Sequence, residues 1–307
     1  MDVAIRTEGL TKRFGSLTAL DHLDLEVPRG EVFGFLGPNG AGKSTTLRLL
    51  LAFIAPTEGS ASILGIDVAD VRAAHPHVAY VPGDVNLWPK LTGAECLDLF
   101  GDLHGAIDHD YRDQLVDRFE LDTRKRARAY SKGNRQKVAL VSAFATRAEV
   151  LLLDEPTSGL DPLMEKQFRV CVDDAKERGQ TVFLSSHILS EVEQLCSRVG
   201  ILRAGQLVEV ATLDRLRSLH STSFEIDLPA DAISSVPDLT GIDGVAAVDA
   251  TPTGLRIAHT GPPGPLLRAI DGLPLTALRS EEASLEEIFL TYYGSPDAAV
   301  PAAAAGA

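Results

Sequence analysis

A glycine-rich turn near the N-terminus constrains the fold of this chain more than any other feature. An apolar run at 31–36 stops at this turn, and helical spacing over 43–53 then places Leu47, Leu50 and Leu51 on one face. The turn therefore lies between a predicted strand and a predicted helix, the context that the pattern G-x-x-x-x-G-K-[ST] requires. Its residues are Gly37, Pro38, Asn39, Gly40, Ala41, Gly42, Lys43, Ser44 and Thr45. In this context an ordinary glycine-rich turn is the weaker interpretation.

The turn has the chemistry of a phosphate-binding loop. Glycines let successive backbone N–H groups converge on an anion, and the N-terminus of the following helix adds its dipole. Lys43 supplies a point charge for the β- and γ-phosphates, and the Ser44 hydroxyl can coordinate Mg²⁺. We therefore expect the chain to bind a nucleoside triphosphate together with Mg²⁺.

A second chemical element follows about 111 residues after Lys43, where the apolar run 150–153 ends in Asp154 and Glu155. Ligands of doubly wound sheets bind at the carboxyl ends of the strands, which is where both carboxylates would lie. Asp154 is expected to hold Mg²⁺, directly or through water. Glu155 is expected to accept a proton from the attacking water, or at least to polarise it.

Strand-like and helical patterns alternate along the first two thirds of the chain. The short apolar runs 150–153 and 181–184 are typical of buried parallel strands. Such alternation favours an α/β domain with helices on both faces of the sheet, and we place its end near residue 215. Strands are also expected at 3–10 and 23–28, and helices at 93–104, 110–120, 133–147 and 164–178.

The composition changes near residue 220. Residues 1–220 hold 26 basic and 31 acidic side chains, whereas residues 221–307 hold 3 and 12. Four short strand-like runs in the second stretch, separated by Pro and Gly, predict a small α+β domain over 221–294. Helices are expected there at 230–236, 263–271 and 284–293. The Ala- and Pro-rich residues 295–307 predict a disordered tail.

A third motif, YSKGNRQK at 130–137, lies between the phosphate-binding loop and the Asp-Glu strand. Alone, it could be no more than the start of a helix that Ser131 caps. With its neighbours, it resembles the signature L-S-G-G-Q of the nucleotide-binding subunits of ATP-binding-cassette (ABC) transporters, with Tyr for Leu, Lys for the first Gly and Asn for Gln. The resemblance covers residues 1 to about 215. It implies that Ser131 and Gly133 contact the γ-phosphate held on another subunit.

Three further matches follow the order of the family. Asp161, in the run SGLD, resembles the end of the loop that crosses the dimer interface. His187 ends the run TVFLSSH and fits the switch histidine on the γ-phosphate. Phe14 fits the aromatic residue that stacks on adenine. Singly, such a His or Phe is more often structural, and it is their order and spacing that favour the functional interpretation.

The resemblance implies a P-loop NTPase of the ABC type. The expected architecture is a mixed core sheet with flanking helices, an antiparallel β subdomain and a helical signature subdomain at about 86–147. One departure concerns Gly83, which stands where the family usually has a glutamine that ligates Mg²⁺. Either Asp84 replaces that ligand, or water fills the position and Asp84 is only a turn residue.

The loop that follows contains the single tryptophan of the chain, Trp88. In the family this region faces the membrane-spanning subunit. Leu87, Trp88 and Leu91 are therefore candidates for a docking surface, and packing of Trp88 on its own helical subdomain is the alternative.

These motifs imply an ATPase that dimerises around ATP and Mg²⁺, because one phosphate-binding loop and one signature need a second copy or a different cassette to complete two sites. The family implies export through separate membrane-spanning subunits, since the run SLEEIF at 284–289 resembles the tail of drug and antibiotic exporters. A cassette acting on ribosomes or DNA is the alternative, although such proteins usually carry two cassettes or long coiled-coil insertions. A P-loop phosphotransferase is another, but it would need neither the signature nor His187.

Charge and apolar patterning exclude several other classes. A net charge of −14 argues against bulk attraction to nucleic acid, and the basic run 124–128 is typical of a solvated surface. The three cysteines have no metal-ligand spacing and are expected to be reduced thiols of a cytosolic protein. No apolar run reaches the ~18–20 residues that span a bilayer. The expected location is cytoplasmic, on the inner face of the cell membrane through a membrane partner.

Overall fold

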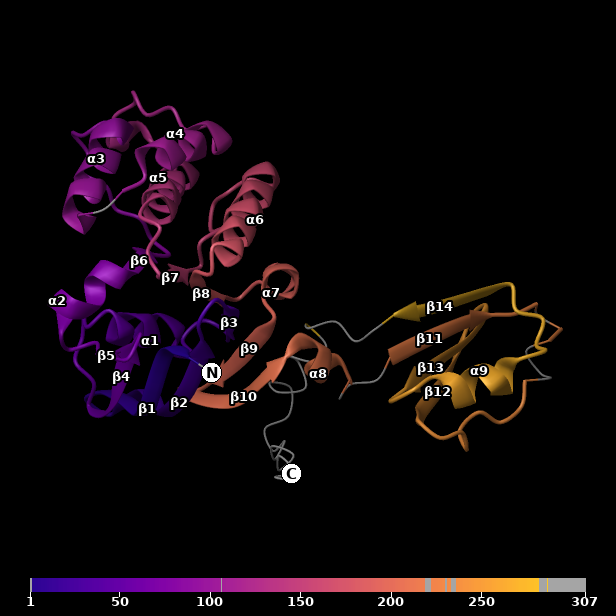
Figure 1. The fold of residues 1–307 in the computed structure, drawn as a ribbon. Coiled ribbons are helices and arrows are strands. Elements are labelled where there is room, and N and C mark those ends of the chain that lie inside the picture. The colour runs from indigo at the N-terminus through magenta and orange to yellow at the C-terminus, as the bar shows by residue number, and fades with distance from the viewer. Residues whose placement is uncertain are drawn as a thin grey trace. The chain divides into compact units, whose positions relative to one another are not determined.

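The computed structural model describes residues 2–105, 107–218, 222–229, 231–232, 236–281 and 286 of the 307-residue chain. The chain divides into two units, Met1–Val210 and Ala211–Ala307, whose elements are drawn in Figure 1. The division lies five residues before position 215, where the sequence patterns place the end of the first domain.

The N-terminal part of the first unit is an antiparallel sheet with one apolar face. Its two long strands form a hairpin in which Phe14 pairs with Leu17, and alternate residues of both strands are buried. In sheet order, the strands are β2 (Leu17–Pro28), β1 (Val3–Phe14), β4 (Glu58–Ile63) and β5 (Ile66–Asp67). Both long strands exceed the predicted 3–10 and 23–28, because the exposed hairpin end carries no apolar alternation that would reveal it.

A second sheet, largely parallel, forms the centre of this unit. Within it, β3 pairs in parallel with β8 and β9, and β7 pairs in parallel with β6 and β8. Every residue of β3, β7 and β8 is buried, as continuous apolar runs predict. In sheet order, the strands are β10 (Gln206–Thr212), β9 (Arg198–Arg203), β3 (Val32–Leu36), β8 (Thr181–Ser186), β7 (Val150–Asp154) and β6 (Val78–Val81).

Helix α1 (Lys43–Leu50) shares one hydrophobic core with both sheets. Leu47 of α1 belongs to the same buried cluster as Ile5 of β1 and Phe183 of β8. The start of α1 is thereby fixed against the carboxyl end of β3. Outside the helical subdomain, the other described α-helices of this unit are α2 (Val71–Ala74), α6 (Pro162–Glu177) and α7 (Leu189–Leu195).

The chain between β6 and β7 contains a helical subdomain. Its helices are α3 (Gly93–His104), α4 (His109–Arg118) and α5 (Lys132–Ala145), and α5 packs against the other two. Side chains of Thr92, Asp108 and Ser131 each accept a backbone N–H at the start of one helix, which explains where these helices begin. These bounds agree closely with the helices predicted from periodicity at 93–104, 110–120 and 133–147. Figure 1 shows the three helices side by side.

The second unit contains a four-stranded antiparallel sheet and helix α9 (Gly264–Ile270). Phe224, Ile226 and Ile257 form its core together with Leu266 and Ile270 of α9. In sheet order, the strands are β12 (Val245–Thr251), β13 (Gly254–His259), β11 (Thr222–Asp227) and β14 (Ala277–Glu281), and a short helix α8 (Leu213–Ser218) precedes them. The predicted helix 284–293 and tail 295–307 lie outside the described residues except for Glu286, and the predicted helix 230–236 lies partly outside them.

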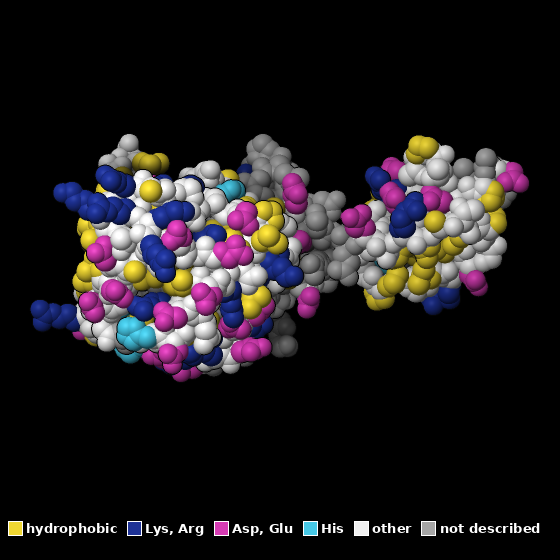
Figure 2. Space-filling model, turned by 90° about the horizontal axis from the view of Figure 1, so that it is seen from above, with side chains coloured by type: hydrophobic (Ala, Val, Ile, Leu, Met, Phe, Trp, Pro, Cys, Tyr) yellow, Lys and Arg dark blue, Asp and Glu magenta, His cyan; other side chains and the backbone are white. Residues whose placement is uncertain are grey.

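Within the described ranges, no helix is both long enough and apolar enough to cross a bilayer. On the face shown in Figure 2, Lys and Arg side chains are interspersed with Asp and Glu on both units. Interspersed charges of both signs are typical of a solvated surface.

Candidate functional site

The glycine-rich loop joins the end of β3 to the start of α1 and borders a cavity of about 140 Å³. The lining residues come from the loop itself, from the end of the β1–β2 hairpin and from the end of β7. They are Ala19, Asn39, Gly40, Gly42, Lys43, Ser44, Thr45 and Glu155. The fold therefore brings Glu155 to the loop. Gly37, Pro38 and Ala41 lie in the loop but do not line this cavity.

The backbone at Gly42 explains why the loop needs glycine. Gly42 has a φ of 115°, and a Cβ added there would lie 2.7 Å from the Ala19 carbonyl oxygen, so a side chain is excluded. Helix α1 starts at the next residue, and its first hydrogen bond runs from the Thr46 N–H to the Gly42 carbonyl. The preceding N–H groups of Lys43, Ser44 and Thr45 have no acceptor within the helix, which is the arrangement that binds phosphate.

Lys43 is the cation of this cavity, and its side chain is only 5% exposed. Its Nζ donates hydrogen bonds to the carbonyl oxygens of Gly37 at 2.5 Å and Pro38 at 3.2 Å. Burial lowers the pKa of the Lys43 ammonium, and the nearby Glu155 and Asp154 charges oppose that shift. A buried ammonium held by loop carbonyls is oriented in advance for an anionic ligand.

Asp154 ends β7 and is buried at 6% exposure. Its Oδ1 accepts a hydrogen bond of 2.5 Å from Ser185 Oγ on β8, the residue directly opposite in the parallel register. This bond leaves lone pairs of the carboxylate for a ligand. Asp154 and the Ser44 hydroxyl are hard oxygen donors, so the residues present fit Mg²⁺.

Glu155 follows Asp154 and is held in an unusual backbone conformation. Its φ is 47°, in the left-handed region, which costs an L residue about 1–2 kcal/mol. The Glu155 N–H donates to the Ser185 carbonyl at 3.0 Å. Its Oε1 lies 3.0 Å from His187 Nδ1 and 3.9 Å from Lys43 Nζ. The structure thus brings Lys43 and His187 close to one oxygen of the Glu155 carboxylate. A strained backbone, such as that of Glu155, is typical of functional sites.

The signature residues lie elsewhere in the chain, at the start of α5. Ser131 is exposed, and its Oγ accepts the Asn134 N–H at 3.2 Å. Gly133, in the first turn of α5, packs against the Gly159 carbonyl. Neither Ser131 nor Gly133 lines the cavity beside the phosphate-binding loop. The structure therefore does not bring them to the Lys43 cluster within one chain.

Two other predicted residues lie at the ends of elements. Asp161 caps α6, and its Oδ1 accepts the N–H groups of Leu163 at 3.0 Å and Met164 at 3.1 Å. Phe14 ends β1 and is 49% exposed, which leaves ring surface open to a ligand. Lys12 Nζ lies 5.1 Å from the centroid of the Phe14 ring, within cation–π range.

Gly83 lies against the end of β7, where a Cβ added to it would be 3.2 Å from the Asp154 carbonyl oxygen. Such a contact is tight, so a side chain at this position would require the strand end to yield slightly. Asp84 is exposed and does not line the loop cavity. The role of Asp84 as a metal ligand therefore stays a prediction.

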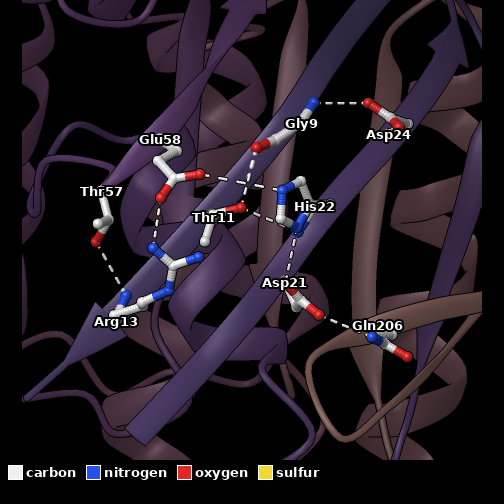
Figure 3. Close-up of polar contacts among 9 residues, drawn as sticks. All are labelled: Gly9, Thr11, Arg13, Asp21, His22, Asp24, Thr57, Glu58 and Gln206. Atoms are coloured by element: carbon white, nitrogen blue, oxygen red, sulfur yellow. Dashed lines mark hydrogen bonds and ion pairs between the residues drawn. The ribbon is translucent and has the colours of Figure 1, made fainter. Parts of the chain in front are cut away.

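A polar network on the antiparallel sheet supports the hairpin that carries Phe14 (Figure 3). Arg13 pairs with Glu58 on β4, and His22 Nδ1 lies 2.7 Å from Asp21 Oδ1. Gln206 of β10 donates to Asp21 Oδ2 at 2.7 Å. The network therefore connects the hairpin to β10 of the core sheet. The residue before Gln206, Gly205, donates its N–H to the Ala41 carbonyl in the phosphate-binding loop.

Sequence reasoning missed Ser185 and the contacts that α5 makes with the loop after Glu155. Lys132 Nζ donates to Ser158 Oγ at 2.7 Å, and the buried Gln136 Nε2 donates to the Pro156 carbonyl at 2.9 Å. The two apolar runs do not specify the strand register that pairs Ser185 with Asp154. No signal in the sequence indicates the Lys132–Ser158 bond.

Comparison with known proteins places this geometry in a family. The family model described as "ABC transporter" matches residues 20–158. The bacitracin transport ATP-binding protein BcrA of Bacillus licheniformis is 34% identical over 96% of this chain and 98% of its own length. The chain belongs to the ABC transporter family.

Two more relatives refine the comparison. The daunorubicin resistance ATP-binding protein DrrA3 of Streptomyces coeruleorubidus is 40% identical over 71% of either chain. A solved dimeric ATP-binding cassette with bound ADP and Pi matches with a TM-score of 0.62 and 25% identity, over 68% of this chain and 98% of its own. These findings confirm the predicted family, the cassette fold and the ATPase class. This ABC protein is an ATP-binding subunit that powers transport.

Proposed function

We propose that two copies of this ABC subunit, or one copy and a related cassette, close head to tail around two ATP molecules and drive export of a drug or antibiotic. The observation that carries the proposal is the cluster of Lys43, Glu155 and His187 beside the phosphate-binding loop. Export is supported by the relatives named for bacitracin transport and daunorubicin resistance.

In the proposed site, the N–H groups at the start of α1 and the Lys43 ammonium hold the phosphates, while the Phe14 ring stacks on adenine. Bound Mg²⁺, held by Ser44 and Asp154, would neutralise charge on the phosphate oxygens. Glu155 accepts a proton from the attacking water. His187, 3.0 Å from the Glu155 carboxylate, orients that carboxylate and reaches toward the γ-phosphate.

The signature residues require a second chain in this proposal. Ser131 and Gly133 lie apart from the loop cavity of their own chain, and the start of α5 carries no acidic residue in its first turn. An anion on another chain is therefore a suitable ligand for this helix terminus. Asp161 would stand at the same interface, where its capping bonds hold the start of α6.

A groove of about 430 Å³ between the core and the helical subdomain is the proposed docking surface for a membrane-spanning partner. Phe53 and Leu103 line it and are 59% and 71% exposed. The half-exposed Trp88 ring lies 5.8 Å from Phe100, which also lines the groove. Exposed apolar side chains around a groove favour an apolar partner helix, and binding there would place the chain on the inner face of the membrane.

Glu155→Gln tests the catalytic assignment. The amide keeps the size of the side chain but cannot accept the proton, so turnover should fall by ~10²–10⁴ while ATP still binds. ATP should then trap a dimer that size-exclusion chromatography detects, and wild-type protein should not accumulate it. Glu177→Gln, the same change at the exposed last residue of α6, is the matched control and should keep its turnover. Hydrolysis by Glu155→Gln at the wild-type rate would refute the role of Glu155.

A further inference from the structure

Lys132 stands where the family signature has its first glycine, and its side chain lies along the loop between β7 and α6 of its own chain. Its Nζ donates a hydrogen bond of 2.7 Å to Ser158 Oγ. Its aliphatic stem covers Gly159, because a Cβ added to that glycine would lie 3.3 Å from both Lys132 Cγ and Cδ. Lys132 thus joins the first turn of α5 to this loop.

Two neighbouring contacts fix the backbones on either side of this bond. The buried Gln136 Nε2 donates to the Pro156 carbonyl at 2.9 Å. Gly133 lies so close to Gly159 that an added Cβ would be 2.3 Å from the Gly159 carbonyl oxygen. The loop and α5 therefore move together, and the Lys132 bond adds a side-chain link to Ser158.

The loop in turn determines where the Glu155 carboxylate lies. The Ser158 N–H donates to the Glu155 carbonyl at 3.1 Å, so Ser158 is one hydrogen bond from the backbone of Glu155. Glu155 has a φ of 47°, a conformation that persists only where the surroundings enforce it. Releasing Ser158 would let this backbone relax and would move the carboxylate away from His187.

We propose that Lys132 is a positioning residue that holds the Glu155 carboxylate through Ser158 and thereby links the two nucleotide sites of the dimer. The inference rests on the proposed function, in which Ser131 and Gly133 contact the nucleotide of the partner chain while Glu155 acts on that of its own. Closure of the α5 turn on the partner's nucleotide is then transmitted through Lys132 to Glu155.

A double-mutant cycle on the full-length chain tests this link. Lys132→Met and Ser158→Ala should each lower kcat for ATP about five- to tenfold and change KM less than about twofold, since nucleotide still binds but the carboxylate is misplaced. The double variant should be no slower than the slower single variant. Lys132→Arg should restore kcat because it keeps a cation that reaches Ser158. Lys166→Met, an exposed lysine on α6, is the matched control.

An assay of nucleotide-driven dimerisation distinguishes two roles of Lys132. In one, Lys132 positions Glu155; in the other, it binds the partner's γ-phosphate directly. In the Glu155→Gln background, Lys132→Met should leave the ATP-trapped dimer intact. Loss of that dimer, additive effects in the cycle, or wild-type kcat in Lys132→Met would each overturn the inference. Should Lys132→Met fail to fold by circular dichroism, the smaller change Ser158→Ala still decides it. Wild-type hydrolysis by Glu155→Gln alone would instead refute the proposed function.

Discussion

Gly133→Ala should abolish most ATP turnover without unfolding the protein. Gly133 lies in the first turn of α5, and a Cβ at this position would be 2.3 Å from the Gly159 carbonyl oxygen. Real Cβ atoms do not approach closer than 3.0 Å, so either the start of α5 or the loop that contains Gly159 must move by at least 0.7 Å. That loop begins at Glu155, four residues before Gly159.

The expected effects on stability and on catalysis differ in size. Overpacking costs about 1–3 kcal/mol, and the better helix propensity of alanine returns up to ~1 kcal/mol. The free energy of unfolding should therefore fall by about 0–3 kcal/mol, or a few degrees in Tm. A shift approaching 1 Å at a catalytic group can cost up to ~10²-fold, so kcat should fall about 10- to 100-fold.

Phosphate release measures kcat, and titration of a fluorescent ATP analogue measures binding to the phosphate-binding loop, which should change less than about twofold. Gly241→Ala is the matched control because a Cβ at Gly241 meets nothing within 4 Å, so its kcat should equal that of wild type. A Gly133→Ala protein that turns over ATP at the wild-type rate would refute the reasoning that the α5 turn and the Glu155 loop are rigidly packed.

Three further changes test separate parts of the site and fold. Phe14→Ala should raise KM for ATP about 5- to 100-fold, since base stacking contributes ~1–3 kcal/mol, whereas Phe53→Ala should leave the KM of the isolated chain unchanged. If Asp84 ligates Mg²⁺, Asp84→Ala should raise the Mg²⁺ requirement of ATPase about tenfold, and an unchanged requirement excludes that role. Hydrogen bonds from Thr92 lower the pKa of the Glu95 carboxyl below 4.5 in the folded protein. The stability advantage of wild type over Glu95→Gln should therefore be full above pH 4.5 and should disappear as the pH falls through the folded-state pKa. Thermal unfolding of both proteins near pH 7 and near pH 3 measures this difference.

Elements whose boundaries are set locally could be predicted from the sequence. Helix α3 occupies the predicted 93–104 because Thr92 caps its start and Gly105, with a φ of 80°, ends it. Strand β7 could be predicted because a continuous apolar run is typical of a strand that is buried on both faces. It extends the predicted range 150–153 by Asp154 alone. The phosphate-binding loop could likewise be predicted from the sequence. Gly42 has a φ of 115°, a backbone conformation that residues with a side chain avoid, so the position requires glycine.

Contacts between distant segments could not be predicted in the same way. Ser185 meets Asp154 because β7 and β8 align in one particular parallel register, which apolar runs of uniform character do not specify. Lys132 reaches Ser158 only after α5 has packed on the loop that follows β7.

The distribution of acidic side chains among the helices explains how a chain of net charge −14 suits a polyanionic ligand. Helices α3, α4 and α6 each carry an acidic residue in the first turn, Glu95, Asp110 and Glu165, which offsets the positive end of the helix dipole. Helices α1 and α5 carry none in that turn. Helices α1 and α5 begin at the phosphate-binding loop and at the signature, so their positive ends stay available to phosphate. The other described α-helices without such a residue, α2 and α9, begin at neither motif. Under the proposed function, an acidic substitution in the first turn of α1 or α5 should weaken ATP affinity far more than the same charge anywhere in the acidic second unit.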